Sequence, residues 1–413
     1  MSLIGRQPVC NENYLITGYD ILFRDEELSP DFSDISISAS VLNRILNEFG
    51  LESVLGGYQG FLKADIEFLQ SNIVTTIPSE HFVLMILESS LFHPELETVL
   101  KRLHEKGYRF GLNSCILDSK TLERIESLKS WLSYIRIDVL RSSDENYSDI
   151  FKRLKQMKQA VIASKVETHE ILDRYKEYGA DLYQGYYIKR PHTIENESLS
   201  MSQESIVRIW DLLQRDADIS VIVKALEQDH ALVLQMLQFI NSSFFSFSST
   251  ITSVKQVISL IGRKAFGNWL LLLLVSHKSG GNTNHPLLLM VINRTEILSG
   301  LLMLSTPKYT REELDTAYLV GMLSLIHLLL NMDHREFLHK LHVSAEIEEA
   351  MFEAQGRWGQ LLTMARHIEN MDIESLQPFI KRYNINTVQM NELIAKAMEK
   401  VNAFDAMMQT TFL

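Results

Sequence analysis

The sequence predicts an α/β barrel in the first half of the chain and an all-helical domain in the second half. Up to about residue 195, short apolar runs alternate with segments of helical periodicity; beyond residue 203 nearly every segment has helical periodicity. Strands that alternate with helices indicate βα units and a parallel sheet. Seven such strands without a Gly-rich phosphate loop favour a TIM-barrel-like fold over a doubly wound sheet. We place the barrel at residues 1–192, a linker at 193–203 and the helical domain at 204–413.

The predicted strands of the barrel are short and apolar. A continuous apolar run such as Phe82–Leu87 is typical of a strand buried on both faces. Between the strands, Ser38–Phe49 has apolar residues at i, i+3, i+4 and i+7, and Asp118 is a candidate N-cap for a helix over Ser119–Lys129. Further helices are expected at Glu95–Glu105, ending near Gly107, and around Phe151–Met157 and Thr168–Tyr178. The seven strands are Tyr14–Phe23, Gly60–Ala64, Phe82–Leu87, Tyr108–Asn113, Ile135–Val139, Ala160–Ala163 and Leu182–Gln184.

The second half follows a polar stretch without periodicity, HTIENESLSMSQ at residues 192–203. The segment Trp269–Val275 is apolar on all sides, which predicts a helix in the centre of the bundle. The expected helices are Ile206–Arg215, Ile219–Leu226, Ala231–Asn241, Val254–Leu260, Arg263–His277, Pro286–Ser305, Arg311–Asn331, Ala345–Phe352, Trp358–Asn370 and Val388–Ala406.

Composition and charge exclude several classes of protein. The chain has 413 residues, 46% of them hydrophobic, and a formal net charge of −12. Its two cysteines, Cys10 and Cys115, are too few for a disulfide scaffold or a Cys-rich zinc site. The first residues have no apolar signal region, and Trp269–Val275, taken as the most apolar run, is far shorter than the ~20 residues of a membrane span. We expect a cytoplasmic protein. Both halves are acidic, so nucleic-acid binding is not expected.

The functional residues of a β/α barrel lie at the C-terminal ends of its strands. Here these ends carry a recognisable series of short segments: GYDILFR at residues 18–24, YIRID at 134–138, VET at 166–168 and GADLYQGYYIKRP at 179–191. In this order the segments resemble the EAL domain family of bacterial cyclic-di-GMP phosphodiesterases, over about residues 5–192. The helical half resembles an HDOD domain, through LEQDHALVLQMLQFINSSFFSFSSTITSVKQVISLIG at 226–262 and AYLVGMLSLIHLLL at 317–330.

The EAL resemblance implies hydrolysis with two divalent cations, which require several carboxylate or carbonyl oxygens at one place. In this chain the matching positions are depleted. Asp20 stands at the signature Glu position and Arg136 at the catalytic Lys position, whereas Asp138, Glu167 and Gln184 keep their family matches. The remaining positions hold Lys63 for an Asn, Met85 for a Glu, Asn113 and Ser114 for an Asp pair, and Ser164 for an acidic residue. We therefore expect vestigial catalytic positions, no metal and no cofactor.

Two basic side chains of the barrel have alternative interpretations. Lys63 either replaces the lost metal charge by pairing with Asp20, Asp138 or Glu167, or points into solvent at a strand end. Arg24 matches a family residue that contacts phosphate, a role that suits a guanidinium, or it pairs with Asp25 or Glu26. With Leu22 and Gln184, Arg24 defines a candidate site for cyclic-di-GMP.

The helical half has no His-Asp dipeptide, so no hydrolytic metal site is expected; the corresponding helix reads Gly321-Met322-Leu323-Ser324-Leu325. The histidines His334, His339 and His342 could bind a transition metal, although a solvated helix face is favoured. Phe244, Phe245 and Phe247 are either an exposed partner site or, as favoured, anchors of a loop. Cys115 follows a strand as a nucleophile could, but a buried core residue is favoured.

The sequence therefore predicts a non-catalytic signalling protein that acts through protein–protein interaction and is linked by resemblance to cyclic-di-GMP. The first alternative is a metal-independent cyclic-di-GMP receptor. The second is a weakly active cyclic-di-GMP phosphodiesterase with an altered metal site. The protein partner is not identified by the sequence.

Overall fold

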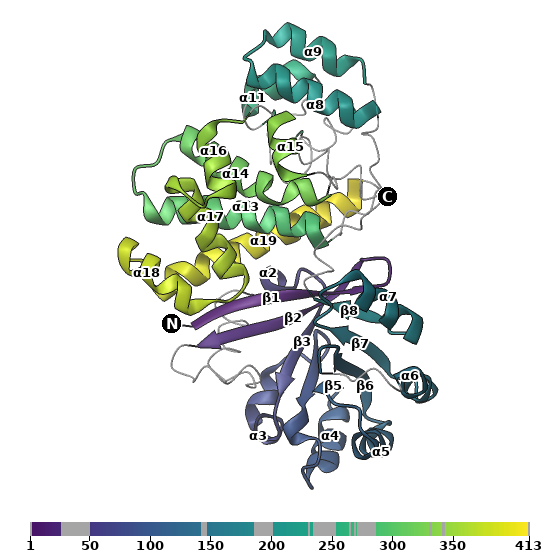
Figure 1. Ribbon diagram of the computed structural model, residues 1–413. Coiled ribbons are helices and arrows are strands. Elements are labelled where there is room, and N and C mark those ends of the chain that lie inside the picture. The colour runs from purple at the N-terminus through teal and green to yellow at the C-terminus, as the bar shows by residue number, and fades with distance from the viewer. Residues whose placement is uncertain are drawn as a thin grey trace. The chain divides into compact units, whose positions relative to one another are not determined.

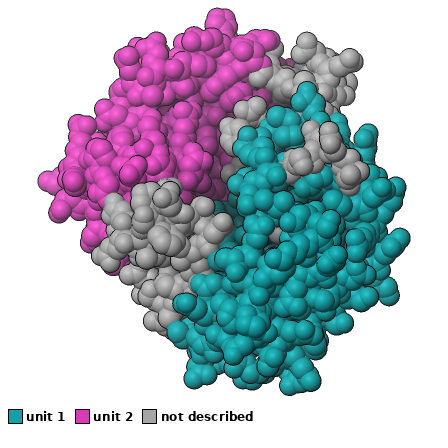
Figure 2. All heavy atoms as spheres, turned by 60° about the horizontal axis from the view of Figure 1, so that its bottom comes forward, with its two compact units in different colours: residues 1–190 teal, residues 191–413 magenta. Residues whose placement is uncertain are grey.

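The chain divides into two compact units, residues 1–190 and 191–413, which Figure 2 distinguishes by colour. The computed structural model describes residues 2–25, 50–141, 147–185, 201–229, 232–233, 253–263, 266–267, 270, 286–329, 333–340 and 343–411. Within these ranges the first unit contains a barrel and the second is helical (Figure 1). The fold class predicted from the sequence is confirmed.

Eight strands close the barrel in sequence order. The strands are β1 (Ser2–Asn11), β2 (Ile16–Asp25), β3 (Gln59–Ala64), β4 (Phe82–Leu87), β5 (Arg109–Cys115), β6 (Leu132–Asp138), β7 (Ala160–Ser164) and β8 (Leu182–Gln184). Strand β1 pairs antiparallel with β2 and β8, and all other neighbours are parallel.

The sequence predicted seven strands, and this number was wrong because β1 was not predicted. In this strand Arg6, Gln7 and Pro8 interrupt the apolar alternation that marks a strand in a sequence. What holds β1 in place is its long antiparallel pairing with β2, which runs from Ser2 opposite Asp25 to Cys10 opposite Ile16. A pairing of this kind depends on the partner strand and has no local sequence signal.

Helices cover the outside of the barrel, and three of them begin at side-chain caps, Asp65, Asp118 and Thr168. The Asp118 carboxylate accepts a hydrogen bond from the Thr121 amide at 2.7 Å and caps α5, as predicted. The helices are α2 (Leu51–Leu55), α3 (Ile66–Gln70), η2 (Asn72–Thr76), η3 (Glu88–Ser90), α4 (Leu96–His104), α5 (Ser119–Leu128), α6 (Tyr147–Gln156) and α7 (His169–Tyr178). The predicted helix Ser38–Phe49 lies outside the described residues.

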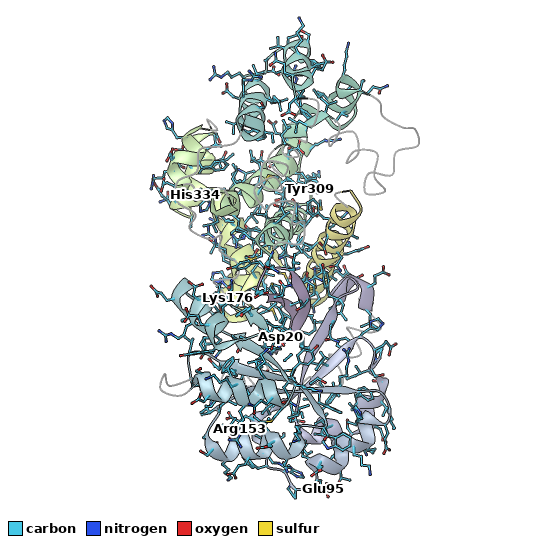
Figure 3. The ribbon with its side chains drawn as sticks, turned by 90° about the vertical axis from the view of Figure 1, so that its right-hand side faces the viewer. Asp20, Glu95, Arg153, Lys176, Tyr309 and His334 are labelled. Carbon is cyan, nitrogen blue, oxygen red and sulfur yellow. The ribbon has the colours of Figure 1, made fainter. Side chains whose placement is uncertain are left out.

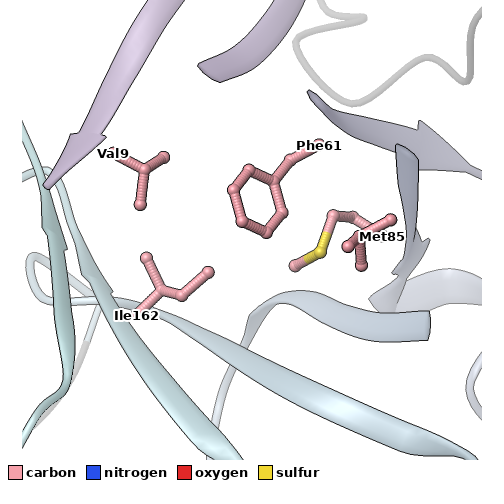
Figure 4. Packing of buried hydrophobic residues seen from close by; sticks show 5 residues of the cluster. Val9, Phe61, Met85 and Ile162 are labelled. Carbon is pink, nitrogen blue, oxygen red and sulfur yellow. The ribbon is translucent and has the colours of Figure 1, made fainter. Parts of the chain in front are cut away.

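Apolar side chains form a buried cluster inside the barrel. Val9, Phe61, Val83, Met85 and Ile162 come from the four strands β1, β3, β4 and β7 and form one buried cluster. Figure 4 shows their side chains directed toward one another across the barrel interior. We call this cluster the apolar floor, because the polar residues at the strand ends lie above it.

The helical unit is organised around α13 (Pro286–Ser305), which packs against α14, α17 and α19. The predicted bounds of α13 and α16 are confirmed, whereas α15 and α18 had no counterpart in the sequence prediction; α18 carries Pro378 in its interior, which disrupts the helical pattern of the sequence. The other described helices are α8 (Met201–Gln214), α9 (Ile219–Glu227), α11 (Val254–Ile261), α14 (Arg311–Leu329), α15 (His334–Lys340), α16 (Ala345–Phe352), α17 (Gly356–Glu369), α18 (Ile373–Tyr383) and α19 (Thr387–Thr411).

Helix α13 has the length and composition of a membrane span, with a mean hydropathy of 1.7 over its most apolar window. Trp269–Val275 is therefore not the longest apolar segment of the chain, contrary to the expectation from the sequence, although the bounds of α13 were predicted correctly. In the structure 67% of that window of α13 is buried inside the protein. This burial is that of a core helix, whose apolar residues face other helices.

Candidate functional site at the mouth of the barrel

A buried ion pair occupies the centre of the barrel above the apolar floor. Nη1 of Arg136, on β6, lies 2.9 Å from Oδ1 of Asp20 on β2. The same Nη1 donates to Oδ1 of Asn113, on β5, at 3.0 Å. Arg136 and Asn113 are each 2% exposed and Asp20 is 3% exposed. Figure 3 locates Asp20 among the strands. One guanidinium therefore joins β6 to the neighbouring β5 and, across the barrel, to β2.

Gln184 binds the other carboxylate oxygen of Asp20 and is itself bound by Gln7. Nε2 of Gln184, on β8, donates to Oδ2 of Asp20 at 3.1 Å and to Oε1 of Gln7 at 2.9 Å. Gln7 lies opposite Asp20 in the pairing of β1 with β2. Both carboxylate oxygens of Asp20 are thus engaged by side chains of the barrel itself, which is what a buried carboxylate requires.

A second buried carboxylate, Asp138, ends strand β6. Its Oδ2 lies 2.6 Å from Nζ of Lys165, and its Oδ1 accepts from the Leu140 amide at 3.0 Å. The Asp138 side chain is 2% exposed, whereas that of Lys165 is 57% exposed. Beside this pair, the Ser164 hydroxyl donates to the Ile137 carbonyl at 2.8 Å. The ammonium of Lys165 therefore covers a buried carboxylate from the solvent side.

Glu88 connects the segments that follow the strands at the rim of the barrel mouth. Its Oε1 accepts from the Ile116 amide at 3.0 Å, and its Oε2 lies 3.4 Å from Nη2 of Arg141. Arg141 also donates to the carbonyl of Ser114 at 3.3 Å. Ser114 has a φ of 47°, a left-handed backbone that turns its carbonyl toward the rim. These contacts link the segments that follow β4, β5 and β6.

The structure brings together most, but not all, of the site residues predicted from the sequence. Asp20, Asn113, Arg136 and Gln184 share one hydrogen-bonded network. Met85 does not belong to it, because its thioether packs into the apolar floor. Glu167 is exposed, and Lys63 and Leu22 are partly buried.

Arg136 contacts Asp20, and Lys165 contacts Asp138. The predicted pairing of Lys63 with either carboxylate stays a prediction. The side chains of Arg24 and Cys115 lie outside the described part of the structure. Gln7 and Lys165 were not predicted as site residues, because Gln7 reaches the site through the pairing of β1 with β2 and Lys165 through the turn after β7.

The polar residues of the mouth do not fit a pair of divalent cations. A dinuclear site requires several carboxylates that converge on one place. Here Oδ1 of Asp20 and Oδ1 of Asn113 accept hydrogen bonds from Arg136, a permanent cation, and Oδ2 of Asp20 accepts from Gln184. The ammonium of Lys165 lies against Oδ2 of Asp138. A metal ion at either carboxylate would meet a positive charge already in place.

The helical unit contains a second buried ion pair. Nε of Arg294, on α13, lies 3.0 Å and 3.1 Å from the two carboxylate oxygens of Glu369 on α17. Nη1 of Arg294 donates to the hydroxyl of Ser324 at 3.2 Å. Ser324 belongs to the helix segment Gly321–Leu325, which stands where an HD hydrolase would carry its His-Asp dipeptide. This segment therefore faces a guanidinium.

Two imidazoles stack next to this pair. The ring centroids of His327 and His334 lie 3.7 Å apart with an angle of 7° between the rings, and His334 contacts the edge of Phe352. Burial, followed by the charge of the neighbouring His334, lowers the pKa of His327 to about 4. Burial also lowers the pKa of His334. The stack is consequently uncharged at neutral pH.

The other sequence-based candidates in this unit have no established role. Phe244, Phe245, Phe247 and His342 lie outside the described residues, and His339 is exposed on α15. Within the described ranges, His, Cys, Asp and Glu side chains form no group of three or more that could hold a metal ion. The transition-metal interpretation of these histidines gains no support.

Comparison with known proteins identifies the two units. Residues 63–191 match the EAL domain model, and residues 199–357 match the HDOD domain model. Two curated relatives span nearly the whole chain. The Bacillus subtilis protein YuxH is 27% identical over 89% of this chain and 90% of its own, and CdgJ of Vibrio cholerae, a cyclic di-GMP phosphodiesterase, is 22% identical over 91% and 86%.

Among solved structures, the EAL domain of Xanthomonas citri FimX in complex with c-diGMP is 17% identical, with a TM-score of 0.37; the match covers 48% of this chain and 91% of that domain. The EAL match begins within β3 and runs to the end of the barrel unit, and the HDOD match lies within the helical unit and ends at the start of α17. The chain is therefore an EAL domain followed by an HDOD domain.

Proposed function

We propose that this protein is a non-catalytic component of cyclic-di-GMP signalling that acts through protein–protein interaction. The observation that carries the proposal is the contact of Arg136 with both Asp20 and Asn113. These two residues stand at positions where the EAL resemblance implies metal-binding carboxylates. A guanidinium bound to both disfavours a divalent cation by charge and by occupancy of the ligand oxygens.

The chemistry of the neighbouring positions supports the same proposal. Met85, which stands at a family glutamate position, offers only a buried thioether, a poor ligand for hard cations. Ser164 uses its hydroxyl to bind the Ile137 carbonyl. Hydrolysis of a phosphodiester requires an activated water, and these side chains supply neither a metal ligand nor a general base.

The link to cyclic-di-GMP comes from the domain type and from the curated relative CdgJ, a cyclic di-GMP phosphodiesterase. The second candidate function is a cyclic-di-GMP receptor. It is favoured by the exposed cationic groups of Lys165 and Arg141 at the mouth, whose side chains are 57% and 45% exposed. Such groups suit an anionic dinucleotide. Weak phosphodiesterase activity is the third candidate.

The test is a pair of measurements on the full-length protein. Turnover of cyclic-di-GMP is followed by chromatography with MgCl₂ or MnCl₂, and binding is followed by calorimetry with and without these salts. We expect no turnover. Turnover that disappears in Asp20→Asn would overturn the proposal, whereas turnover that persists unchanged in Asp20→Asn comes from a contaminant and leaves it standing. Metal-independent binding without turnover would establish the receptor function.

A further inference from the structure

We propose that Arg136 and Lys165 are built-in counter-cations of the barrel mouth, which neutralise Asp20 and Asp138 in place of divalent metal ions. The inference deepens the proposed function and relies on it only for the assignment of the mouth as the former metal site. It predicts that the fold of the mouth needs these two side chains and is indifferent to metal ions.

The burial of the two carboxylates is the first argument. The side chains of Asp20 and Asp138 are 4% and 2% exposed, so water does not solvate them. A buried carboxylate without a compensating cation is strongly unfavourable. Each carboxylate contacts a cation. Asp20 lies 2.9 Å from Nη1 of Arg136, and Asp138 lies 2.6 Å from Nζ of Lys165. The charge balance is therefore complete without an external ion.

The backbone of Lys165 is the second argument. Its φ of 62° lies in the left-handed region, which a residue with a side chain rarely adopts and where glycine is favoured. Lys165 nevertheless occupies the turn directly after β7, and this turn directs its ammonium to Asp138. An unfavourable backbone at a site persists when the surrounding contacts over-determine it. The contact with Asp138 is the interaction that such a lysine supplies and a glycine cannot.

The barrel contains a matched control for this lysine. Lys158 is also exposed and also has a left-handed backbone, with a φ of 65°. Replacing either lysine by glycine relieves the same backbone strain and removes the same charge from the chain. Only Lys165→Gly also removes the cation from a buried carboxylate. The difference between the two variants isolates the counter-cation role.

The experiment compares thermal unfolding of the full-length wild type, Lys165→Gly, Lys165→Arg and Lys158→Gly, each in EDTA and in excess MnCl₂. We expect the Tm of the wild type and of Lys158→Gly to be unaffected by MnCl₂. Lys165→Gly should have a lower Tm than Lys158→Gly in EDTA and should recover part of the loss in MnCl₂. Lys165→Arg should behave like the wild type, because it keeps the charge.

Three outcomes would overturn the inference. The first is equal Tm values for Lys165→Gly and Lys158→Gly. The second is a lower Tm of Lys165→Gly that does not respond to MnCl₂, which would make Lys165 a hydrogen-bond donor only. The third is a wild-type Tm that MnCl₂ raises and that Asp138→Asn makes insensitive. None of these depends on turnover, so a failure here is distinguishable from a failure of the proposed function.

The role of Arg136 is tested by measuring metal binding directly. Removal of Arg136 leaves Asp20, the more deeply placed carboxylate, without its cation. The electron paramagnetic resonance signal of free Mn²⁺ is measured with the wild type and with Arg136→Gln/Lys165→Gly. We expect the wild type to leave the signal of free Mn²⁺ unchanged and the double variant to reduce it. A wild type that takes up Mn²⁺ through Asp20 or Asp138 would overturn the inference. If the double variant does not fold, the exposed position of Lys165 keeps the thermal test decisive.

Discussion

Arg136 and Asp20 form an ion pair of 2.9 Å inside the barrel although 116 residues separate them in the sequence. The pair spans strands β6 and β2, and the ring of Phe61 lies 5.7 Å from the guanidinium. The chain therefore places a fixed positive charge at the centre of its polar mouth. The consequence for stability can be measured directly.

The first prediction concerns this pair. Arg136→Met leaves the Asp20 carboxylate buried beside Gln184 without its cation, and we expect a loss of about 3–5 kcal/mol in the free energy of unfolding. Asp20→Leu should cost a similar amount for the converse reason. The double variant should lose clearly less than the sum of the single variants, because neither buried charge remains. Urea unfolding followed by circular dichroism measures the cycle; strictly additive losses would contradict the coupling.

The second prediction concerns the corresponding pair of the helical unit. Arg294 and Glu369 are each about 9% exposed at the side chain, so Glu369→Gln leaves a guanidinium without its counter-ion between α13 and α17. We expect a destabilisation of about 3–5 kcal/mol, measured as a lower urea midpoint of the helical signal. The exposed pair of Lys152 and Asp149 is the control. Lys152→Ala should leave the midpoint nearly unchanged, because exposed pairs contribute little.

The third prediction concerns pH. The folded state lowers the pKa of His327 from 6.5 to about 4, so the folded protein binds fewer protons here than the unfolded chain. The resulting stability is complete above about pH 6.5 and is lost as the pH falls toward 4. Each pKa unit corresponds to about 1.4 kcal/mol, so we expect a loss on the order of 1–3 kcal/mol between these limits.

Thermal unfolding of the wild type and of His327→Phe as a function of pH tests this effect. The variant keeps an aromatic ring against His334 but cannot take up a proton, so its Tm should fall less steeply on acidification. The charged groups that act on the stack, Asp333, Arg294, Arg335 and Arg366, are unchanged in the variant. His81→Gln, at an exposed position of the barrel, should retain the wild-type slope. Equal slopes for the wild type and His327→Phe would exclude the stack as the cause.

The fourth prediction concerns the close approach of α13 and α14. A Cβ at Gly321 would lie 2.7 Å from the Cα of Thr295, so Gly321→Ala must push two helix backbones apart. We expect a destabilisation of about 1–3 kcal/mol. Gly300→Ala is the control, because its Cβ meets only the flexible side chain of Leu393. A Gly321→Ala protein as stable as Gly300→Ala would show that the two helices can separate without loss.

The sequence by itself determined the features that local chemistry encodes. Continuous apolar runs located β4 and the other parallel strands, the Asp118 cap located the start of α5, and helical periodicity located α4. The order of the short motifs at the strand ends identified the EAL domain. These signals lie within a few residues of the element they specify, which is why they can be read without a structure.

The tertiary structure alone decided which charges meet. The sequence left open whether Lys63 pairs with a buried carboxylate or points into solvent, whereas the structure places Arg136, from β6, at Asp20 and Lys165, from the turn after β7, at Asp138. Closure of the barrel brings β6 opposite β2, and an antiparallel β1 brings Gln7 beside Asp20. Charge compensation in a buried site depends on distances of about 3 Å between side chains on different strands. Such distances are set by the packing of the whole barrel, and no local pattern in the chain records them.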